Sequence, residues 1–547
     1  MSRPGEILRN LRFTTSFVLG AVVTDPVWLT LQAARRLPAR VSAVVVPRVE
    51  SVLGDGSRGR AGRLRAAWAA GDVSTIRSTQ PRGRTERAVR RSLLAQVDSL
   101  APAAPARQTE QEVRPGPRAP LAVHHHLTNS LPHTQSGYTL RTHAILVAQR
   151  AAGLRVSATT RAGYPLTIGA LGARSTDVVD GVAYARLVPR SLAAAPRHRT
   201  DTATSLLVEA VRQARPDVVH ATTPWTTGQA ARDAAGRLGL PWVYEVRGLP
   251  EETWAAALPT PETRAAAATS ERYALIRAKE TELALAADHV VTLSGTMRDE
   301  LVARGVPAGR ISVVPNAVDA ALLDTEVPTP AQARATLGLH GPARLVGTVS
   351  SVVGYEGLDV VLATVARLRA DGEDVGALVV GDGVARPELL RLAATLGIAE
   401  HVVMPGRVPR DLARTYVAAL DVVLVPRRAD RVTRLVTPLK PVEAMALGRP
   451  VVASDLPALR EVCSPLDGGD PAALLVAPDD LTGWADAVRT LLHDDARRSA
   501  CVAAGQEVAA LRTWARLVAR YDLAYRAAVG ARSAGPSQIP RPTPKGA

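Results

Sequence analysis

The sequence predicts an α/β protein in which two doubly wound domains, each built on a parallel sheet, face each other across a cleft. Short apolar runs alternate with helical stretches over most of the 547 residues, a pattern typical of parallel sheets covered on both faces. The alternation occurs twice, and a segment rich in proline and alanine, 325–340, separates the two halves. Hydrophobic residues make up 46% of the chain and the mean hydropathy is +0.04, which is enough apolar surface for two cores.

The first half, 119–325, is expected to form one of the two domains, on the side of the cleft from which an acceptor would enter. Its predicted strands begin at Ala122, Arg155, Asp217, Trp242, His289 and Ile311. The stretches between them that are expected to be helical are Thr139–Ala152, Ala203–Ala214, Gly228–Leu238 and Ala265–Ala287.

The second half, 326–500, repeats the pattern more clearly. Its predicted strands begin at Arg344, Gly376, His401, Asp421, Pro450 and Leu474. Its predicted helices are Gly357–Ala370, Ala385–Leu396, Asp411–Leu420 and Val442–Leu447. Further helices are expected over 501–532, and the proline-containing tail 533–547 is expected to be disordered.

A basic extension, 1–118, precedes the two domains. It carries 20 arginines against 9 acidic residues, a net charge of +11 out of +16 for the whole chain, and a basic segment favours anionic partners. The apolar run Phe13–Leu31 is interrupted by Asp25 and Pro26, which argues against a simple transmembrane span. We expect helices at a membrane surface over Ile7–Leu53, with packing on the main body as the alternative. Two helices are expected over 62–100, and a linker near 101–120.

Composition excludes several classes of protein. Two cysteines, Cys463 and Cys501, rule out a disulfide scaffold and a cysteine-based zinc cluster. A zinc site built from His124, His125 and His126 is possible in principle, but buried or loop histidines are the commoner outcome, so no metal is expected. The basic extension lacks the interleaved aromatic residues of a single-stranded nucleic-acid site.

Glycine or polar turns follow successive strands of the second half and predict a phosphate-binding edge. Glycine lets backbone amides approach a phosphate, and a helix N-terminus adds partial positive charge. The residues expected at this edge are Ser350, Gly354, Tyr355, Gly381, Asp382, Gly383, Arg407 and Arg427, and the family resemblance given below implies that they bind a nucleotide-diphosphate donor.

The run Val436–Ala446 adds the most specific signal. Pro441 fits the first turn of a helix, and the loop before it holds Thr437 and Lys440. Lys440 can place a point charge on a diphosphate, and Glu443 can accept hydrogen bonds from a ribose diol. A lone Lys/Glu pair at a solvated helix start is the alternative reading of these two residues.

Together these motifs resemble the retaining glycosyltransferases of family 4, which have the GT-B architecture of two Rossmann-like domains, and within them the bacterial exopolysaccharide-type subgroup. In the first half Ser136, Gly137, Tyr138 and Arg141 resemble the subgroup's acceptor-side loop and helix. Tyr244–Gly248 and Val314–Asp319 match as well. The resemblance covers roughly Ala122–Arg526.

The resemblance implies transfer of a sugar from a nucleotide-diphosphate sugar to an acceptor hydroxyl with retention, in polysaccharide or glycolipid synthesis. It implies no cofactor and no metal, a saccharide or lipid-linked acceptor, and a cytoplasmic enzyme at the inner face of the plasma membrane. His220, at a strand end where family members often carry histidine, Arg247 and Lys440 are the expected catalytic residues.

One departure bears on function. The family often has a glutamate eight residues before the position of Glu443, and Leu435 stands there. With the basic extension, this keeps open a non-catalytic protein that binds sugar nucleotides at the membrane. A nucleotide-sugar 2-epimerase is a further alternative, because such enzymes share the two-domain architecture.

Overall fold

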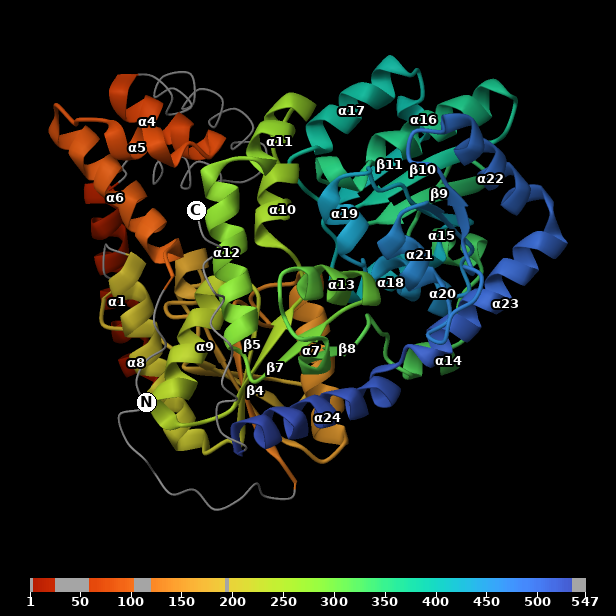
Figure 1. Cartoon of the computed structure of the whole chain (residues 1–547). Helices are drawn as coiled ribbons and strands as arrows, with labels where there is room; N and C mark the ends of the chain where they lie inside the picture. The colour runs from red at the N-terminus through yellow and green to blue at the C-terminus, as the bar shows by residue number, and fades with distance from the viewer. Residues whose placement is uncertain (1–2, 25–58, 103–119, 192–195, 534–547) are drawn as a thin grey trace, which may run out of the picture.

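The computed structural model describes residues 3–24, 59–102, 120–191 and 196–533 and contains two α/β domains, each built on its own sheet (Figure 1). The first sheet has eight strands in the order β3-β4-β2-β1-β5-β6-β7-β8 and the second has six in the order β11-β10-β9-β12-β13-β14. Every pairing is parallel except the β3–β4 hairpin. The predicted fold of two doubly wound domains is confirmed.

The strands of the first sheet are β1 (Ala122–Leu127), β2 (Arg155–Thr160), β3 (Thr176–Val179), β4 (Val182–Arg186), β5 (Val218–Thr222), β6 (Trp242–Val246), β7 (His289–Thr292) and β8 (Ile311–Val313). Its helices are α7 (Gly137–Ala151), η1 (Leu166–Ile168), α8 (Pro196–Ala214), α9 (Trp225–Leu238), α10 (Pro250–Ala256), α11 (Pro261–Ala268), α12 (Glu271–Ala286), α13 (Gly295–Ala303) and η2 (Ala308–Arg310). The β3–β4 hairpin was not predicted, although its Asp180-Gly181 turn, with φ of 47° and 73°, is a strong hairpin signal.

The strands of the second sheet are β9 (Arg344–Val349), β10 (Val375–Val380), β11 (Val402–Gly406), β12 (Val422–Val425), β13 (Val451–Ser454) and β14 (Leu474–Val476). The helices around it are α14 (Ala321–Asp324), α15 (Pro330–Thr336), η3 (Gly354–Glu356), α16 (Leu358–Ala370), α17 (Arg386–Thr395), η4 (Ala399–His401), α18 (Arg410–Ala418), α19 (Arg431–Leu435), α20 (Lys440–Ala446), α21 (Pro457–Cys463), α22 (Leu481–His493) and α23 (Asp495–Leu511).

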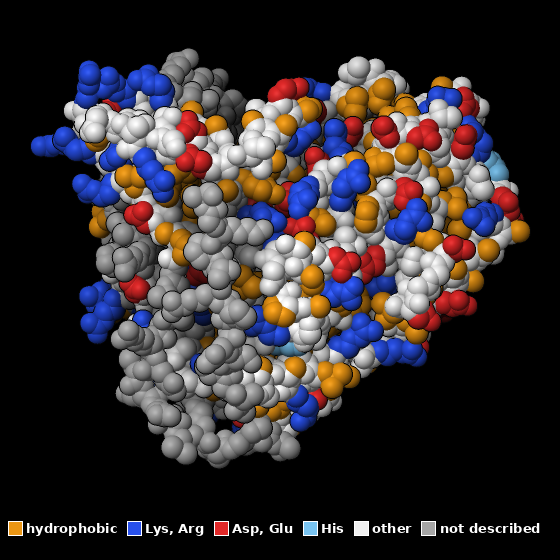
Figure 2. All heavy atoms as spheres, viewed as in Figure 1, with side chains coloured by type: hydrophobic (Ala, Val, Ile, Leu, Met, Phe, Trp, Pro, Cys, Tyr) orange, Lys and Arg blue, Asp and Glu red, His pale blue; other side chains and the backbone are white. Residues whose placement is uncertain are grey.

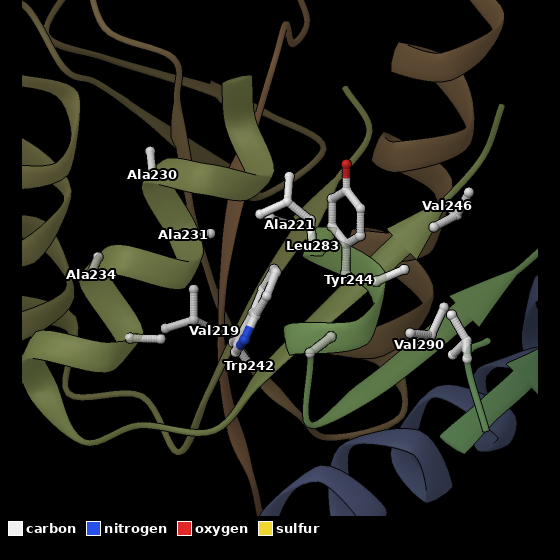
Figure 3. Packing of buried hydrophobic residues seen from close by; sticks show 14 of the residues in the cluster. Val219, Ala221, Ala230, Ala231, Ala234, Trp242, Tyr244, Val246, Leu283 and Val290 are labelled. Atoms are coloured by element: carbon white, nitrogen blue, oxygen red, sulfur yellow. The ribbon is translucent and has the colours of Figure 1, made fainter. Parts of the chain in front are cut away.

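Small side chains allow α9 to lie close to the first sheet. Ala230, Ala231 and Ala234 of α9 belong to one buried apolar cluster with Trp242 and Tyr244 of β6 and Val219 of β5, and Ala231 lies on the side of α9 nearer to these strands (Figure 3). At Gly228 a β-carbon would lie only 2.6 Å from the ring of Tyr244, so a larger residue would push the helix off the sheet.

After α23, which lies along the second domain, the chain crosses back and its last helix, α24 (Trp514–Ser533), packs on the first domain (Figure 1). Trp514, Tyr521 and Tyr525 are buried in the same apolar cluster as residues of β1 and α7. The C-terminal helices thus connect the two domains a second time, in addition to the chain that runs from β8 to β9.

The described part of the basic extension packs on the first domain. Helices α4 (Gly59–Ala70), α5 (Val73–Ser78) and α6 (Arg84–Leu100) form a small bundle, one helix more than predicted. The guanidinium of Arg272 at the start of α12 lies between two indoles, 4.2 Å from the ring centre of Trp68 and 4.4 Å from that of Trp254. Arginine side chains gather over this bundle (Figure 2, upper left).

Helix α1 (Arg3–Thr24) contains the start of the predicted apolar run, whose remainder lies outside the described residues, as does 41–46. Its buried side docks near η1, where Phe13 packs on Leu166 and Ala173 and the Asn10 amide donates to two backbone carbonyls. Within the described ranges, none of the helices is sufficiently long and apolar to cross a bilayer.

We predict that Gly71→Ala loosens the α4–α6 bundle. Gly71 has φ of +86°, and a β-carbon there would lie 2.3 Å from Ser270 Oγ and 2.9 Å from the Trp254 ring. Gly153→Ala is the matched control, since Gly153 has φ of +90° with nothing within 4 Å. Both variants should lose about 1 kcal/mol of stability from backbone strain. Only Gly71→Ala should also speed tryptic cleavage within 59–102, and equal cleavage of the two variants would contradict the prediction.

Candidate active site

Loops at the carboxyl ends of the two sheets meet between the domains, and we call this region the cleft. Asn316, which follows β8 in the first domain, donates from its side-chain amide to the carbonyl oxygen of Thr437 in the second, over 3.0 Å. Tyr355, after β9, packs partly against the apolar cluster of the first domain. Ligands of doubly wound domains bind at such carboxyl edges, so this is the candidate active site.

Two of the predicted donor-binding cations come together on one carboxylate. Lys440 Nζ lies 2.5 Å from Glu356 Oε2, and Arg427 Nη2 lies 3.2 Å from Glu356 Oε1. Arg427 also donates from Nη1 to the carbonyl of Val436 over 2.7 Å. We call Glu356, Arg427 and Lys440 the cleft triad. The structure thus brings together Lys440 and Arg427, two of the residues expected to bind the donor.

Burial and charge act in opposite directions within the cleft triad. Burial by itself would raise the pKa of Glu356, but the neighbouring Arg427 and Lys440 outweigh it and lower that pKa to about 2. Burial lowers the pKa of Lys440, Arg427 lowers it further, and Glu356 opposes both effects. Glu356 therefore favours the charged form of Lys440, against burial and Arg427.

On the first-domain side, Tyr138 lies near Arg427 of this triad, and Arg247 lies behind Tyr138. Arg247 donates to Thr142 Oγ1 over 2.5 Å and to the carbonyl of Tyr138 over 3.3 Å. About half of the Tyr138 side chain is exposed, while its hydroxyl lies over Gly248, where a β-carbon would be 2.7 Å away. The charges of Arg427 and Arg247 both act on the Tyr138 hydroxyl, which places that hydroxyl between the two domains.

Helix α19 closes one side of the cleft. Val432 and Val436 belong to the apolar cluster of the first domain, and Leu435 packs against it. Leu435, at the position where a glutamate was expected from the resemblance, is thus part of an apolar contact between domains. This explains the departure, because a carboxylate there would be desolvated without a partner.

Ion pairs surround that apolar contact. Arg431 of α19 reaches Glu252 over 2.6 Å and Glu300 over 2.7 Å, both in the first domain. Glu461 of α21 accepts hydrogen bonds from the backbone amides of Gly295 and Thr296 at the start of α13.

Comparison with known proteins agrees with this geometry. Residues 343–494 match the family described as "Glycosyl transferases group 1", and residues 136–317 match "Glycosyl transferase 4-like domain". A relative from Stackebrandtia nassauensis, named D-inositol 3-phosphate glycosyltransferase, is 32% identical over 343 residues, which are 59% of this chain and 71% of the relative. A protein of the same name from Xylanimonas cellulosilytica is 33% identical over 54% of this chain and 68% of its own.

The chain belongs to the group 1 glycosyltransferases.

Solved structures show the same GT-B fold. Sucrose-phosphate synthase from Thermosynechococcus elongatus superposes with a TM-score of 0.57 at 20% identity, over 75% of this chain and all of that one. HepE from Anabaena, solved in complex with UDP and glucose, superposes with a TM-score of 0.54 at 18% identity, over 73% of this chain and 98% of that one. The named relatives are inositol-phosphate glycosyltransferases, so the exopolysaccharide subgroup expected from the sequence is not what these comparisons indicate.

His220, an expected catalytic residue, does not face the cleft of this glycosyltransferase, and that expectation is corrected. It has no exposed surface, and its Nδ1 lies 2.7 Å from the Tyr525 hydroxyl and its Nε2 3.2 Å from Glu245 Oε2. Helix α24 covers it, which no local pattern around β5 could indicate. Burial lowers its pKa, so it acts as a neutral hydrogen-bonding group inside the domain.

Arg141 and Ser136 also have structural partners. Arg141 is buried and donates to the carbonyls of Val314 and Pro315, to Asn316 Oδ1, to Glu245 and to the Tyr521 hydroxyl. Ser136 caps α7 by accepting from the amide of Thr139, and Gly137 is the first residue of that helix. Of the predicted acceptor-side loop, the Tyr138 side chain is the part aimed between the domains.

The glycines after β10 serve loop packing. A β-carbon at Gly381 would lie 1.8 Å from the carbonyl oxygen of Ser350, and one at Gly383 would lie 2.1 Å from that of Val352. Asp382 is exposed and accepts from the amide of Gly383. Gly354 opens η3 with free space around it. These residues hold the loops after β9 and β10 against each other, beside the cleft triad.

The remaining predicted donor residues differ in position. Thr437 is buried and tied to Asn316, and Glu443 is half-buried on α20, one turn beyond Lys440. Arg407 is exposed after β11, the edge strand, with β10 and β9 between it and β12. Arg407 thus stands apart from the cleft triad.

The three buried histidines of β1 are hydrogen-bonded inside the first domain. His124 Nδ1 lies 2.9 Å from Ser157 Oγ, and His125 Nε2 lies 2.8 Å from the side-chain oxygen Oε1 of Gln149. Across the described ranges, no group of three or more histidine, cysteine or acidic residues is arranged to hold a metal ion.

Sequence reasoning missed Glu356 and Glu245 as organisers of the site. Glu356 directly follows Tyr355 at the predicted phosphate-binding edge. An acidic residue among cations that are expected to bind phosphate is the feature that could have indicated its role. Glu245 lies in a fully buried strand, where a carboxylate needs partners.

We predict that Arg431→Ala favours separation of the two domains. Arg431 is half-exposed, so its pairs with Glu252 and Glu300 are screened and together contribute about 1 kcal/mol to closure. Small-angle scattering should show a larger radius of gyration for this variant than for wild type at low salt, with the difference shrinking at high salt. Arg434→Ala, an exposed arginine of the same helix, should leave it unchanged, and an equal change in both would sink the assignment.

Proposed function

We propose that this glycosyltransferase moves a sugar from a nucleotide-diphosphate sugar to an acceptor hydroxyl with retention of the anomeric configuration. The observation that carries the proposal is the convergence of Arg427 and Lys440 in the cleft, opposite Tyr138 and Arg247. Two desolvated cations stabilise the negative charge that develops on a leaving diphosphate. The acceptor enters from the first domain, where Tyr138 and Arg247 lie.

The names of the relatives suggest a chemical class of acceptor, not a single compound. The relatives named above act on D-inositol 3-phosphate, and the resemblance of the motifs suggests polysaccharide or glycolipid synthesis. We propose a polyhydroxylated acceptor, with inositol phosphates, oligosaccharides and lipid-linked sugars as the compounds to test.

A panel of nucleotide sugars tests the donor first. A donor at a hundredfold excess over its Kd should stabilise the protein by about 2.7 kcal/mol, which thermal unfolding detects. NMR of the product from the best donor and each acceptor should show a glycoside with the donor's anomeric configuration. Formation of an epimer of the donor in the absence of acceptor would favour the 2-epimerase instead. Donor binding without turnover in the presence of every acceptor would favour the non-catalytic binding protein.

Lys440→Ala should lower kcat/KM by roughly 10²-fold or more, the scale of losing one donor to a transition-state anion. Arg428→Ala is the matched control, because Arg428 follows Arg427 directly but is half-exposed and paired with Asp359 over 3.0 Å. The control should retain activity within a few-fold. Full activity in Lys440→Ala would remove Lys440 from the site.

We propose that the leaving group is neutralised by side-chain cations, without a metal. Activity should therefore survive exhaustive EDTA treatment, measured as initial rate against an untreated sample. Loss of activity that a divalent ion restores would overturn this proposal.

We also propose that the enzyme works at the inner face of a membrane, and α1 supports this. Opposite the docked side of Phe13, α1 exposes Leu8 (70%), Leu11 (53%) and Leu19 (60%), which lie on one helical face, with Ile7 and Val18 beside them. Arg3 and Arg12 are exposed on the same helix. An apolar face with basic residues is the pattern of a helix that lies in an anionic membrane surface.

Replacing Leu8, Leu11 and Leu19 by glutamate should abolish flotation of the full-length protein with phosphatidylglycerol vesicles. The matched control replaces Val178, Val384 and Leu523, exposed apolar residues elsewhere, by glutamate and should float like wild type. High salt should release wild type in part. Equal flotation of the two triple variants would show that α1 is a packing element alone.

A further inference from the structure

The cleft triad places a carboxylate where an anionic ligand is expected. Glu356 is 7% exposed, and both of its oxygens are contacted by cations, Lys440 on one and Arg427 on the other. A buried ion pair is costly to assemble unless its geometry is good, and removing one partner strands the other charge. The arrangement therefore calls for a physical reason beyond stability.

The backbone holds Glu356 firmly in this position. Gly357, the next residue, has φ of +65°, and a β-carbon there would lie 1.9 Å from the carbonyl oxygen of Pro426. The amide of Arg428 donates to the carbonyl of Tyr355 over 3.0 Å. The loop after β9 and the segment after β12 are thus fastened together on both sides of the Glu356–Arg427 contact.

Arg427 retains an unused donor. Its Nη1 and Nη2 are bonded to Val436 and Glu356, while its Nε is buried and has no partner within the described residues. A buried guanidinium with an unsatisfied N–H is suited to a further acceptor. In the triad one carboxylate neutralises part of the charge of two cations, and the free N–H of Arg427 can still donate to an anion.

We propose that Glu356 is a positioning residue of the donor site, which holds Lys440 and Arg427 side by side and keeps Lys440 protonated for the donor diphosphate. This inference rests on the proposed function. It assigns a role to a residue that touches the two cations rather than the reacting atoms.

The charges around Lys440 explain why the lysine needs this partner. The charged groups that face it are Glu356 on η3, Arg427 after β12 and Glu443 on α20 itself, while Tyr138 and Tyr355 lie beside Arg427. Helix α23 meets α20 further along, where Gly505 approaches Met445 and Gln506 approaches Gly448. Burial and Arg427 both favour the neutral amine, and Glu356 is the carboxylate in direct contact that opposes them.

The test is a double-mutant cycle read out by binding of inorganic pyrophosphate between pH 6 and pH 10. Calorimetry measures pyrophosphate binding to wild type, Glu356→Gln, Lys440→Ala and the double variant. The protonation of pyrophosphate itself changes with pH in the same way in all four experiments. The alkaline loss of affinity should move to lower pH by about one unit or more in Glu356→Gln. At pH 6 this variant should bind within about threefold of wild type or more tightly, because its lysine is charged and one competing anion is gone.

Lys440→Ala should lack this alkaline limb, and adding Glu356→Gln to it should change affinity by less than about twofold. Glu356→Asp should restore part of the wild-type pH profile. Four results would each overturn the inference. Two concern Glu356→Gln alone: a pH profile that coincides with that of wild type, or an equal loss of affinity at every pH. The other two are an undiminished effect of Glu356→Gln in the Lys440→Ala background, and no pyrophosphate binding by wild type.

The cycle also separates this inference from the proposed function. A protein that behaves as expected towards pyrophosphate but transfers no sugar would refute the transferase proposal and leave the role of Glu356 intact. A protein that transfers sugar, with an unchanged pH profile in Glu356→Gln, would refute the role of Glu356 alone.

Discussion

A single buried carboxylate, Glu245, organises the first domain's side of the cleft. It has no exposed surface and is contacted by Arg247 over 2.6 Å, by the Tyr521 hydroxyl over 2.9 Å, by Arg141 over 3.1 Å and by His220 over 3.2 Å. Burial would raise its pKa, but Arg247, His220 and Arg141 together hold it well below the usual range. A carboxylate in this environment stays charged only while its donors stay in place, which ties β5, β6, α7 and α24 to one geometry.

That geometry reaches the second domain through two routes. Arg247 extends from Glu245 to Thr142 and to the carbonyl of Tyr138, which aims between the domains. Arg141 extends from Glu245 to Asn316, whose amide holds the carbonyl of Thr437, three residues before Lys440. The position of Lys440 is therefore linked through these contacts to a buried charge inside the first domain, and Tyr521 of α24 belongs to the same network.

The cleft itself is built from compensated charge. Arginine accounts for nearly all of the basic residues, and several of them are desolvated beside carboxylates, as in the cleft triad and in the Arg247–Glu245 pair. A guanidinium is suited to such places because it stays charged and bonds in a planar fork. Lys440 differs from these arginines, because burial and Arg427 lower the pKa of its ammonium while its contact with Glu356 raises that pKa.

The sequence by itself determined the two parallel sheets, because strands buried on both faces must be apolar throughout and the helices between them have a different period. It also placed Arg427 and Lys440 at the cleft, since residues after parallel strands share one edge. The β3–β4 hairpin was predictable from Asp180-Gly181 but was overlooked. Only the tertiary structure decided that His220 points inward, that Leu435 forms an apolar contact between domains and that Glu356 joins the two cations. Those outcomes depend on α24, on the first-domain cluster and on loops more than 70 residues apart in the chain, and a local pattern carries no information about which distant segment will desolvate a given side chain.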